Sequence, residues 1–234
     1  DAMKKLFKCM FWIFIICLAV VSPFINSGYT MYKEALEEIP IDEMVKEIQS
    51  KEYYIKLEDV PKIYLDAVIA VEDRRFYTHG GVDPVSIGRA IITDIQTMSL
   101  REGGSTITQQ LCKNIYFTQE RKLERKIAEV FMAIELEKEL QKEEILELYI
   151  NTSYFGSGCY TLREASLEYF EKEPLDLNES QCILLAGVPN APAIYAPNAN
   201  LELSLQRQQQ VIAKMIDCGY LTEEEANKIL EQEI

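Results

Sequence analysis

The chain has 234 residues, 48% of them hydrophobic, which is enough for one ordinary domain with a real core and an accessory segment. Asp and Glu outnumber Lys and Arg by 38 to 24, so the formal net charge at pH 7 is −14. Because an acidic chain repels phosphate backbones, this composition excludes a general nucleic-acid binder. Six scattered cysteines and a single histidine show no metal-ligand spacing, so the cysteines are interpreted as small apolar packing residues.

An uncharged run from Cys9 to Asn26 follows three lysines near the N-terminus. About 17–25 apolar residues let a helix span a bilayer, whereas a cleaved signal peptide has an apolar core of about 7–15 residues and a small-x-small site. No Ala-x-Ala follows this run. Residues 1–28 are therefore predicted to be a cytoplasmic stub and a single transmembrane helix. The lysines before it and the glutamates after it place the rest of the chain outside the cytoplasm.

Residues 29–54 mix acids, aromatics and prolines with little periodicity, and are predicted to be a tether that leads into a globular domain at 55–234. A strand pattern is found only at 53–57. Helical patterns follow, in chain order, at 63–71, 85–97, 120–140, 142–151, 178–185 and 205–218. Thr222 and the three glutamates after it open a last helix as an N-cap with acids in the first turn. The fold class predicted is mainly α.

The segment 103–114 concentrates small, hydroxyl and amide side chains and ends beside a cation. Its two glycines let the backbone turn sharply and approach a ligand closely. It offers more hydrogen-bonding groups than a helix cap needs, since a cap uses a single Ser or Thr. The segment therefore predicts a surface that holds a polar ligand. The candidate side chains are Ser105, Thr106, Gln109, Gln110, Lys113 and Asn114.

The predicted helix at 120–140 has an apolar stripe and a basic stripe. At 100° per residue the apolar residues share one face, which is expected to be buried. These residues are Leu123, Ile127, Val130, Phe131 and Ile134. The opposite side carries Arg121, Arg125 and Glu129, with Lys126 beside them. Clustered cations in an acidic chain favour an anionic ligand such as pyrophosphate. The alternative is a solvated face in which they pair with neighbouring glutamates.

Adjacent carboxylates, Glu72 and Asp73, end the predicted helix at 63–71, just before a turn that contains glycine. A carboxylate at the edge of an apolar wall can have its pKa raised toward the range useful to a general base. Glu72 and Glu129 then form a separated carboxylate pair of the kind that sugar-transfer chemistry uses. His79 and Asp73 have simpler alternatives as hydrogen-bonded structural residues.

Four ordered motifs resemble the glycosyltransferase family 51 domains, the peptidoglycan glycosyltransferases found alone or joined to penicillin-binding transpeptidases. The first motif is carried by Glu72, Asp73, Phe76, His79, Gly81 and Asp83. The second is 103–111 with Lys113 and Asn114, the third is Arg125, Lys126 and Glu129, and the fourth runs over 142–151. The resemblance covers roughly 55–230. Cys112 and Cys159 stand where relatives have small aliphatic residues, which leaves the chemistry intact.

This resemblance implies a lysozyme-like fold with a large head and a small membrane-proximal jaw that includes part of 85–102. It implies that lipid II is polymerised into β-1,4-linked glycan with inversion and release of polyprenyl pyrophosphate. Glu72 is the expected base, and Glu129 orients cations or holds a divalent ion, Mg or Mn, at the pyrophosphate; no cofactor is obligatory. The substrate-binding residues expected are Lys113, Arg121, Arg125, Lys126, Ser105, Thr106, Gln109, Gln110, Asn114, Asp73, Phe76 and His79.

The expected partners are lipid II, the lipid-linked glycan strand, the membrane and other proteins of cell-wall synthesis, at the outer face of a bacterial cell membrane. Two alternatives remain: a lytic muramidase, which needs no pyrophosphate-sized cation cluster, and a noncatalytic membrane-tethered scaffold. No Ser-x-x-Lys or Lys-Thr-Gly motif of a transpeptidase occurs in these 234 residues. The sequence therefore fits either a monofunctional enzyme or part of a bifunctional one.

Overall fold

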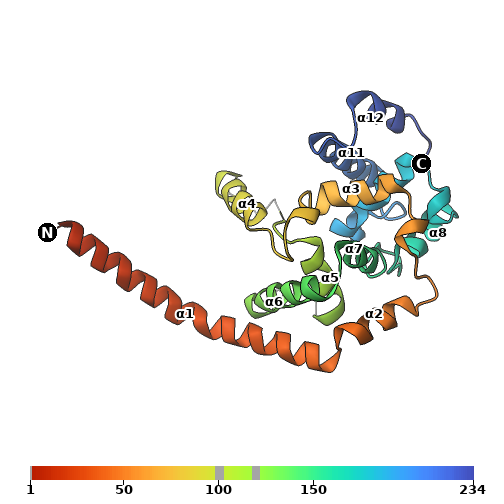
Figure 1. The fold of residues 1–234 in the computed structure, drawn as a ribbon. Coiled ribbons are helices and arrows are strands. Elements are labelled where there is room, and N and C mark those ends of the chain that lie inside the picture. The colour runs from red at the N-terminus through yellow and green to blue at the C-terminus, as the bar shows by residue number, and fades with distance from the viewer. Residues whose placement is uncertain (1, 98–102, 118–121) are drawn as a thin grey trace.

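The protein is described here from a computed structural model, which covers residues 2–97, 103–117 and 122–234 and leaves some side chains of α1 (Ala2–Glu38) and α4 (Pro84–Thr97) undescribed. Helices account for the regular structure of these residues (Figure 1). The β pairing among them is limited to two isolated bridges, Gly80 with Val82 and Gly156 with Cys159. The prediction of a mainly α fold is confirmed for the described part of the chain.

The prediction of a strand at 53–57 is wrong, since the segment forms no strand. Its polar backbone groups bond instead to α7 (Lys142–Ile150) and to the residue after it. The Ile55 N–H donates to the side chain of Asn151 at 2.9 Å, and the Asn151 amide donates back to the Ile55 carbonyl at 2.8 Å. The Leu57 N–H donates to Glu147 at 2.9 Å. With its backbone groups satisfied by side chains, the segment needs no neighbouring strand.

Residues 29–49, expected within a tether, are largely helical and pack on the domain. The C-terminal half of α1 lies along α6 (Leu123–Glu139), and a Cβ on Gly28 would approach the Ile127 side chain to 2.7 Å. The ring of Tyr32 stacks on Phe131 with centroids 5.9 Å apart. In α2 (Ile41–Gln49), Met44 is buried in the core. Aromatic packing thus helps to hold the C-terminal half of α1 on the domain, where the sequence shows little periodicity, whereas α2 coincides with the periodic stretch 42–48.

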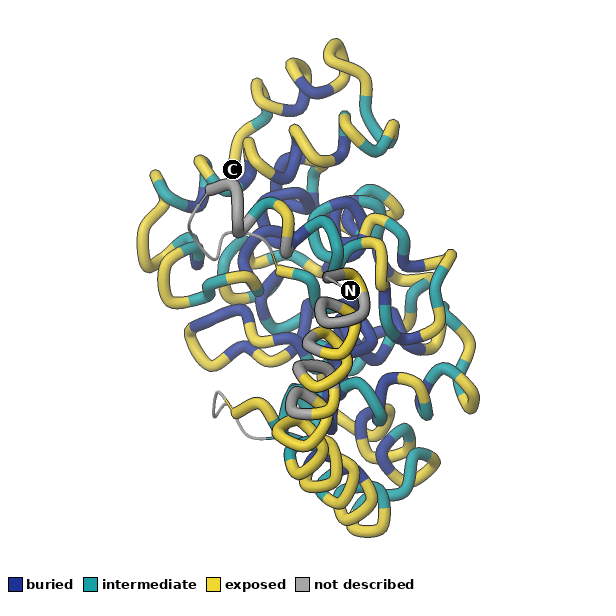
Figure 2. Tube along the Cα trace, turned by 90° about the vertical axis from the view of Figure 1, so that its left-hand side faces the viewer, coloured by how far each residue is buried: buried dark blue, intermediate teal, exposed yellow. Residues whose placement is uncertain are grey.

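The N-terminal half of α1 extends away from the rest of the molecule (Figure 1), and its described apolar side chains, such as Phe11 and Leu18, are exposed (Figure 2). Several side chains of the predicted membrane span, including Ile13 and Phe14, lie outside the described residues. Within the described part of the chain, no helix combines the length and hydropathy needed to cross a bilayer. The transmembrane helix stays a prediction.

The centre of the domain is α9 (Glu179–Gly187), on which α3 (Lys62–Glu72) and α11 (Leu201–Asp217) pack. Every residue of α9 from Ser180 to Gly187 is buried, as expected for a helix enclosed on all sides (Figure 2). Beside it, α5 (Ile107–Tyr116) packs against both α6 and α7. The remaining elements are α8 (Leu162–Phe170), α10 (Pro192–Tyr195) and α12 (Glu223–Leu230).

The helices predicted at 63–71, 85–97, 120–140, 142–151, 178–185 and 205–218 correspond to α3, α4, α6, α7, α9 and α11, so these predictions are confirmed over the described residues. Thr222 caps α12, as predicted, through a hydrogen bond from the Glu225 N–H. The helices α2, α5, α8 and α10 were missed. Of these, α5 begins inside the segment interpreted as a ligand surface, and α8 follows a turn that contains Gly156 and Gly158.

The prediction of which face of α6 is buried is wrong in part. Leu123 and Ile134, on the apolar stripe, are 54% and 39% exposed, whereas Glu129 on the opposite side is 1% exposed. The side that faces the core consists of Ala128, Glu129, Met132, Ala133 and Leu136. Small side chains on this side allow close packing, and the apolar stripe is covered incompletely by α1. On the basic side Arg125 is largely buried beside Glu129, whereas the Lys126 side chain is 42% exposed and Lys122 is exposed, so the solvated alternative holds for part of this face.

Candidate active site

Glu72 is the last residue of α3 and is held by a side chain of α5. The Gln110 amide donates to Glu72 Oε2 at 2.7 Å, and the buried Tyr149 hydroxyl lies 3.5 Å from the Gln110 carbonyl oxygen. Glu72 Oε1 is shut off from solvent and has no hydrogen-bond partner among the described residues. Burial raises the Glu72 pKa, against the lowering effect of Gln110 and of the cations Arg207 and Lys113. Glu72 Oε1 is therefore the carboxylate oxygen that the described residues leave without a hydrogen bond.

A group of cations lies on the α6 side of Glu72. The buried Glu129 carboxylate forms ion pairs with Arg125 and, at 2.8 Å, with Lys126. Lys126 also donates to the Ser105 hydroxyl at 2.6 Å. Burial, then Arg125 and Lys113, lower the Lys126 pKa to about 8. Burial and Arg125 also lower the Lys113 pKa. Burial is the larger cause of both shifts and the neighbouring cations add to it, so three cations share one carboxylate, Glu129, which favours an added anion.

A second group of cations lines a cleft of about 310 Å³ that Glu72 itself lines. Its members are Arg74, Arg89, Arg207 and Lys214, from the turn after α3, from α4 and from α11, and the same cleft is lined by the four carboxylates Glu72, Asp73, Asp83 and Asp217. None of these four residues was predicted as a site residue, because they are far apart in the chain and form no local cluster. A signal existed for two of them: Arg207 and Lys214 are seven residues apart, which puts them on one face of a helix.

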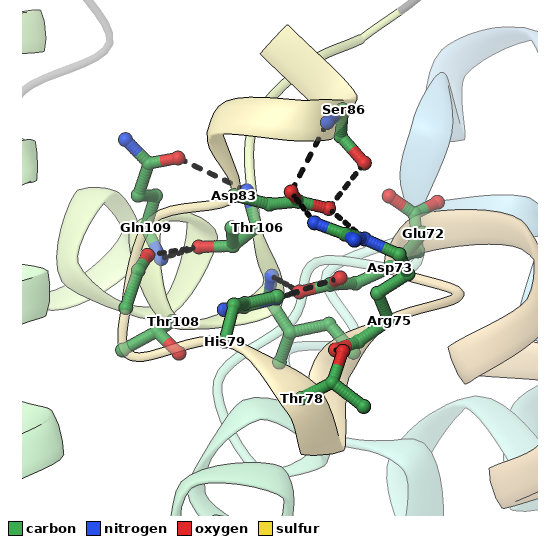
Figure 3. Close-up of polar contacts among 12 residues, drawn as sticks. Glu72, Asp73, Arg75, Thr78, His79, Asp83, Ser86, Thr106, Thr108 and Gln109 are labelled. Atoms are coloured by element: carbon green, nitrogen blue, oxygen red, sulfur yellow. Dashed lines mark hydrogen bonds and ion pairs between the residues drawn. The ribbon is translucent and has the colours of Figure 1, made fainter.

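The first two motifs are joined by buried hydrogen bonds (Figure 3). His79 Nε2 lies 2.9 Å from each carboxylate oxygen of Asp73, and Asp73 Oδ2 accepts the Ile107 N–H at the start of α5 at 3.1 Å. The Thr106 hydroxyl donates to the Gly81 carbonyl at 2.6 Å. Burial raises the Asp73 pKa, and His79 opposes the shift. These contacts fix α5, and with it Gln110, relative to Glu72.

Most of the other predicted site residues are buried or partly buried and bond within the protein. Thr106 and Gln109 form a reciprocal capping box at the start of α5 and are both 2% exposed. Phe76 is fully buried, with the Lys142 ammonium 4.4 Å from its ring centroid. Asn114, one turn beyond Gln110, donates to the Thr152 carbonyl at 3.2 Å. Arg121 lies outside the described residues. Substrate contact by each of these stays a prediction.

Two places in the site carry side chains that can bind metal ions: the cluster of Asp73, His79 and Asp83, and the carboxylate of Glu129. Ligand atoms of Asp73, His79 and Asp83 lie within 4.8 Å of one another. Asp83 is already bonded to Arg75, to Ser86 and to the Val85 N–H, and Arg75 holds its pKa well below the usual range. Both oxygens of Glu129 are likewise paired with cations. Asp83 and Glu129 are therefore already neutralised by cations, whereas Asp73 contacts His79 and accepts the Ile107 N–H. A divalent ion at the pyrophosphate stays a prediction.

Comparison with known proteins decides the family. The transglycosylase family profile matches residues 39–216, a span that contains α5, Glu72 and both groups of cations. The chain belongs to the transglycosylase family. This confirms the resemblance to glycosyltransferase family 51, while the match begins at residue 39 rather than near 55, in agreement with the packing of α2 on the domain.

Relatives of the transglycosylase chain include much longer proteins. It is 43% identical over 175 residues to penicillin-binding protein 1A of Aquifex aeolicus, covering 75% of this chain and 24% of that protein. It is 44% identical over 172 residues to penicillin-binding protein 1F of Bacillus subtilis, covering 74% and 24%. The chain thus spans about a quarter of these relatives. The crystal structure of penicillin-binding protein 1A from Haemophilus influenzae aligns with a TM-score of 0.47 at 24% identity, covering 77% of this chain and 17% of that one.

Proposed function

We propose that this transglycosylase domain is a peptidoglycan glycosyltransferase that polymerises lipid II into β-1,4-linked glycan strands. One observation carries the proposal. Glu72, a buried carboxylate with a raised pKa, is near both groups of cations, since Lys113 of one and Arg207 of the other each act to lower its pKa. A sugar-transfer reaction between two lipid-linked diphosphates needs this combination of one base and cations for the two diphosphates.

Glu72 Oε1 takes the proton from the 4-hydroxyl of the acceptor sugar. The hydroxyl oxygen attacks the anomeric carbon of the donor, and the bond from that carbon to the pyrophosphate oxygen breaks. Attack from the face opposite the leaving group inverts the configuration and gives a β-linkage. The bond electrons leave with polyprenyl pyrophosphate, whose negative charge grows as the bond breaks.

The α6 group of cations, Lys113, Arg125 and Lys126, suits the donor pyrophosphate, because preplaced cations stabilise charge that develops in the transition state. Glu129 holds Arg125 and Lys126 in place and contacts no reacting atom in this scheme. The second group, which includes Arg89 and Arg207, suits the pyrophosphate of the acceptor lipid II. No step uses a metal ion.

The proposal has three further parts, which concern the membrane anchor, the jaw around α4 and the bounds of the domain. Enzyme and substrates share one membrane surface if the apolar run 9–26 anchors the chain with its domain outside the cytoplasm. A lysozyme-like head with a jaw around α4 accounts for the exposed apolar side chains Val85 and Ile92 on that helix, which are 55% and 58% exposed. Residues 55–234 then form the glycosyltransferase domain, with other proteins of wall synthesis as partners.

The test is to incubate the protein separately with lipid II and with intact cell-wall sacculi. Glycan strands from lipid II, separated by gel electrophoresis, with no soluble fragments from sacculi, are the expected result. Release of fragments from sacculi without synthesis would make the protein a lytic muramidase. Inertness toward both substrates would favour a noncatalytic scaffold.

A further inference from the structure

An apolar groove of about 580 Å³ lies where the end of α1, the helix α2 and the end of α6 meet. Its apolar lining includes Leu36, Ile41, Val45 and Leu140, which pack against the core but are only partly buried. The groove shares no lining residue with the cleft beside Glu72. Contiguous apolar surface on a soluble domain usually marks a place where another molecule binds.

The shape of the groove suits a helix. One of its walls is the side of α2 that carries Ile41, Asp42, Val45, Lys46 and Gln49. From Ile41 to Gln49 this wall is about 12 Å long at 1.5 Å per residue. An amphipathic helix fills a groove with side chains at i, i+3, i+4 and i+7, which cover about 10.5 Å. Two turns of a partner helix therefore match the length of the groove.

The charge of the groove is uneven. Lys46 pairs with Asp42 at 3.0 Å, and Glu135 pairs with Lys138 at 2.8 Å. Among the described residues that line the groove, Glu139 is the one charged side chain without an ion pair. Glu139 is also the last residue of α6, where the helix dipole places partial negative charge on the backbone carbonyls. This end of the groove therefore attracts a cation.

A lipid is the other candidate for an apolar groove. Leu36 lies ten residues beyond the apolar run 9–26 on the continuous helix α1, which is about 15 Å further along its axis. If that run spans the membrane, the groove is outside the hydrocarbon layer. The unpaired carboxylate of Glu139 also repels anionic lipid headgroups. Both observations favour a protein helix over a lipid.

We propose that this groove binds an amphipathic helix of a partner protein, which has apolar side chains along one face and an arginine or lysine at the end that meets Glu139. The apolar side chains cover Leu36, Val45 and Leu140, and the cation fixes the direction of the helix in the groove. The groove is separate from the cleft beside Glu72, so the proposal goes beyond the proposed function and does not depend on it.

Two synthetic helical peptides test the groove. The arginine peptide has leucines at i, i+3, i+4 and i+7 and arginines after the last leucine, and the glutamate peptide has glutamates in place of the arginines. Binding to the full chain in nanodiscs of a neutral lipid is measured by fluorescence anisotropy, with empty nanodiscs as the blank. The arginine peptide should bind more tightly. Val45→Asp should weaken its binding about tenfold, because a charge then faces apolar side chains.

Glu139→Lys should reverse the preference, so that the arginine peptide binds several-fold more weakly and the glutamate peptide several-fold more tightly. Misfolding cannot produce the gain for the glutamate peptide. Glu231→Lys is the matched control, because it makes the same change of charge at an exposed residue after α12, on the opposite side of the molecule from α2 (Figure 1). It should leave the binding of both peptides unchanged.

The proposal is overturned if the wild-type chain does not bind the arginine peptide, or if Val45→Asp and Glu139→Lys bind both peptides as the wild type does. A nitroxide on Lys46→Cys tests for lipid in the groove of the chain in nanodiscs. Relaxation by a water-soluble nickel chelate is expected. Relaxation mainly by dissolved oxygen would place the groove in lipid and would also overturn the proposal.

Discussion

The cleft beside Glu72 and the groove between α2 and the end of α6 differ in charge, although they belong to one chain of net charge −14. The cleft beside Glu72 is lined by four cations, Arg74, Arg89, Arg207 and Lys214, and by four carboxylates, Glu72, Asp73, Asp83 and Asp217. Lys126 bonds to Ser105, which also lines this cleft. The groove carries three carboxylates against one lysine. Cations thus balance the carboxylates where a diphosphate would bind, and are outnumbered by carboxylates in the groove. A chain's net charge therefore says little about an individual site.

The largest effect on activity is expected when Glu72, the proposed base, is replaced. A base at this position would place the reaction in the cleft lined by Arg74, Arg89 and Arg207. Glu72→Gln removes the proton acceptor and should slow lipid II polymerisation by about 10²–10⁴-fold. Strand synthesis near the wild-type rate would rule out this base.

Folding of the Glu72→Gln variant is checked by thermal unfolding. Burial raises the Glu72 pKa in the folded state, so wild-type stability falls as pH rises through the window above the unfolded value. The variant should therefore match or exceed wild-type stability at pH 8.

The next effect concerns the cations on the α6 side. Lys113→Ala should lower kcat by about 10²-fold, because one preplaced charge no longer stabilises the leaving pyrophosphate. Single-turnover kinetics with lipid II measure it. Binding of the arginine peptide should be unchanged, since Lys113 does not line the groove. Equal losses in both assays would mean that the cleft and the groove are not separate sites.

A smaller effect is expected at Gln110, which holds Glu72 by a 2.7 Å hydrogen bond that lowers the Glu72 pKa. Gln110→Ala removes that bond, so the Glu72 pKa should rise further. Polymerisation requires the ionised base, and the acid limb of the pH–rate profile should therefore move to higher pH. At pH 7 the loss should be about tenfold, the usual size of one hydrogen bond to a charged group. An unmoved profile with the same loss would indicate that Gln110 acts on the substrate instead.

The smallest effect is that of salt. Raising the ionic strength from about 0.1 M to about 1 M shortens the Debye length from about 10 Å to about 3 Å. The KM for lipid II should rise a few-fold, because two groups of cations bind its diphosphates. In the same buffers the Kd of the glutamate peptide for the groove should fall, because salt screens its repulsion by Glu139. Parallel salt dependence would contradict the difference in charge between the cleft and the groove.

The motifs made the site predictable in part, since Glu72, Lys113 and the Arg125–Glu129 stretch were found as short patterns and the structure brings them together. The cations of the second group were missed because their positions depend on how α3, α4 and α11 pack. The capping role of Gln109 was not foreseen, because a capping side chain and a ligand-binding side chain look alike in a sequence.

The sequence by itself determined the helical fold class and pointed to Glu72 as the candidate base, because apolar periodicity and local motif spacing are properties of neighbouring residues. Only the tertiary structure decided which side of α6 is buried, which oxygen of Glu72 remains free and which residues line the cleft and the groove. These features arise where distant segments pack against one another. Side-chain burial and partner geometry are set by that packing, and they in turn set the charge state on which the chemistry depends.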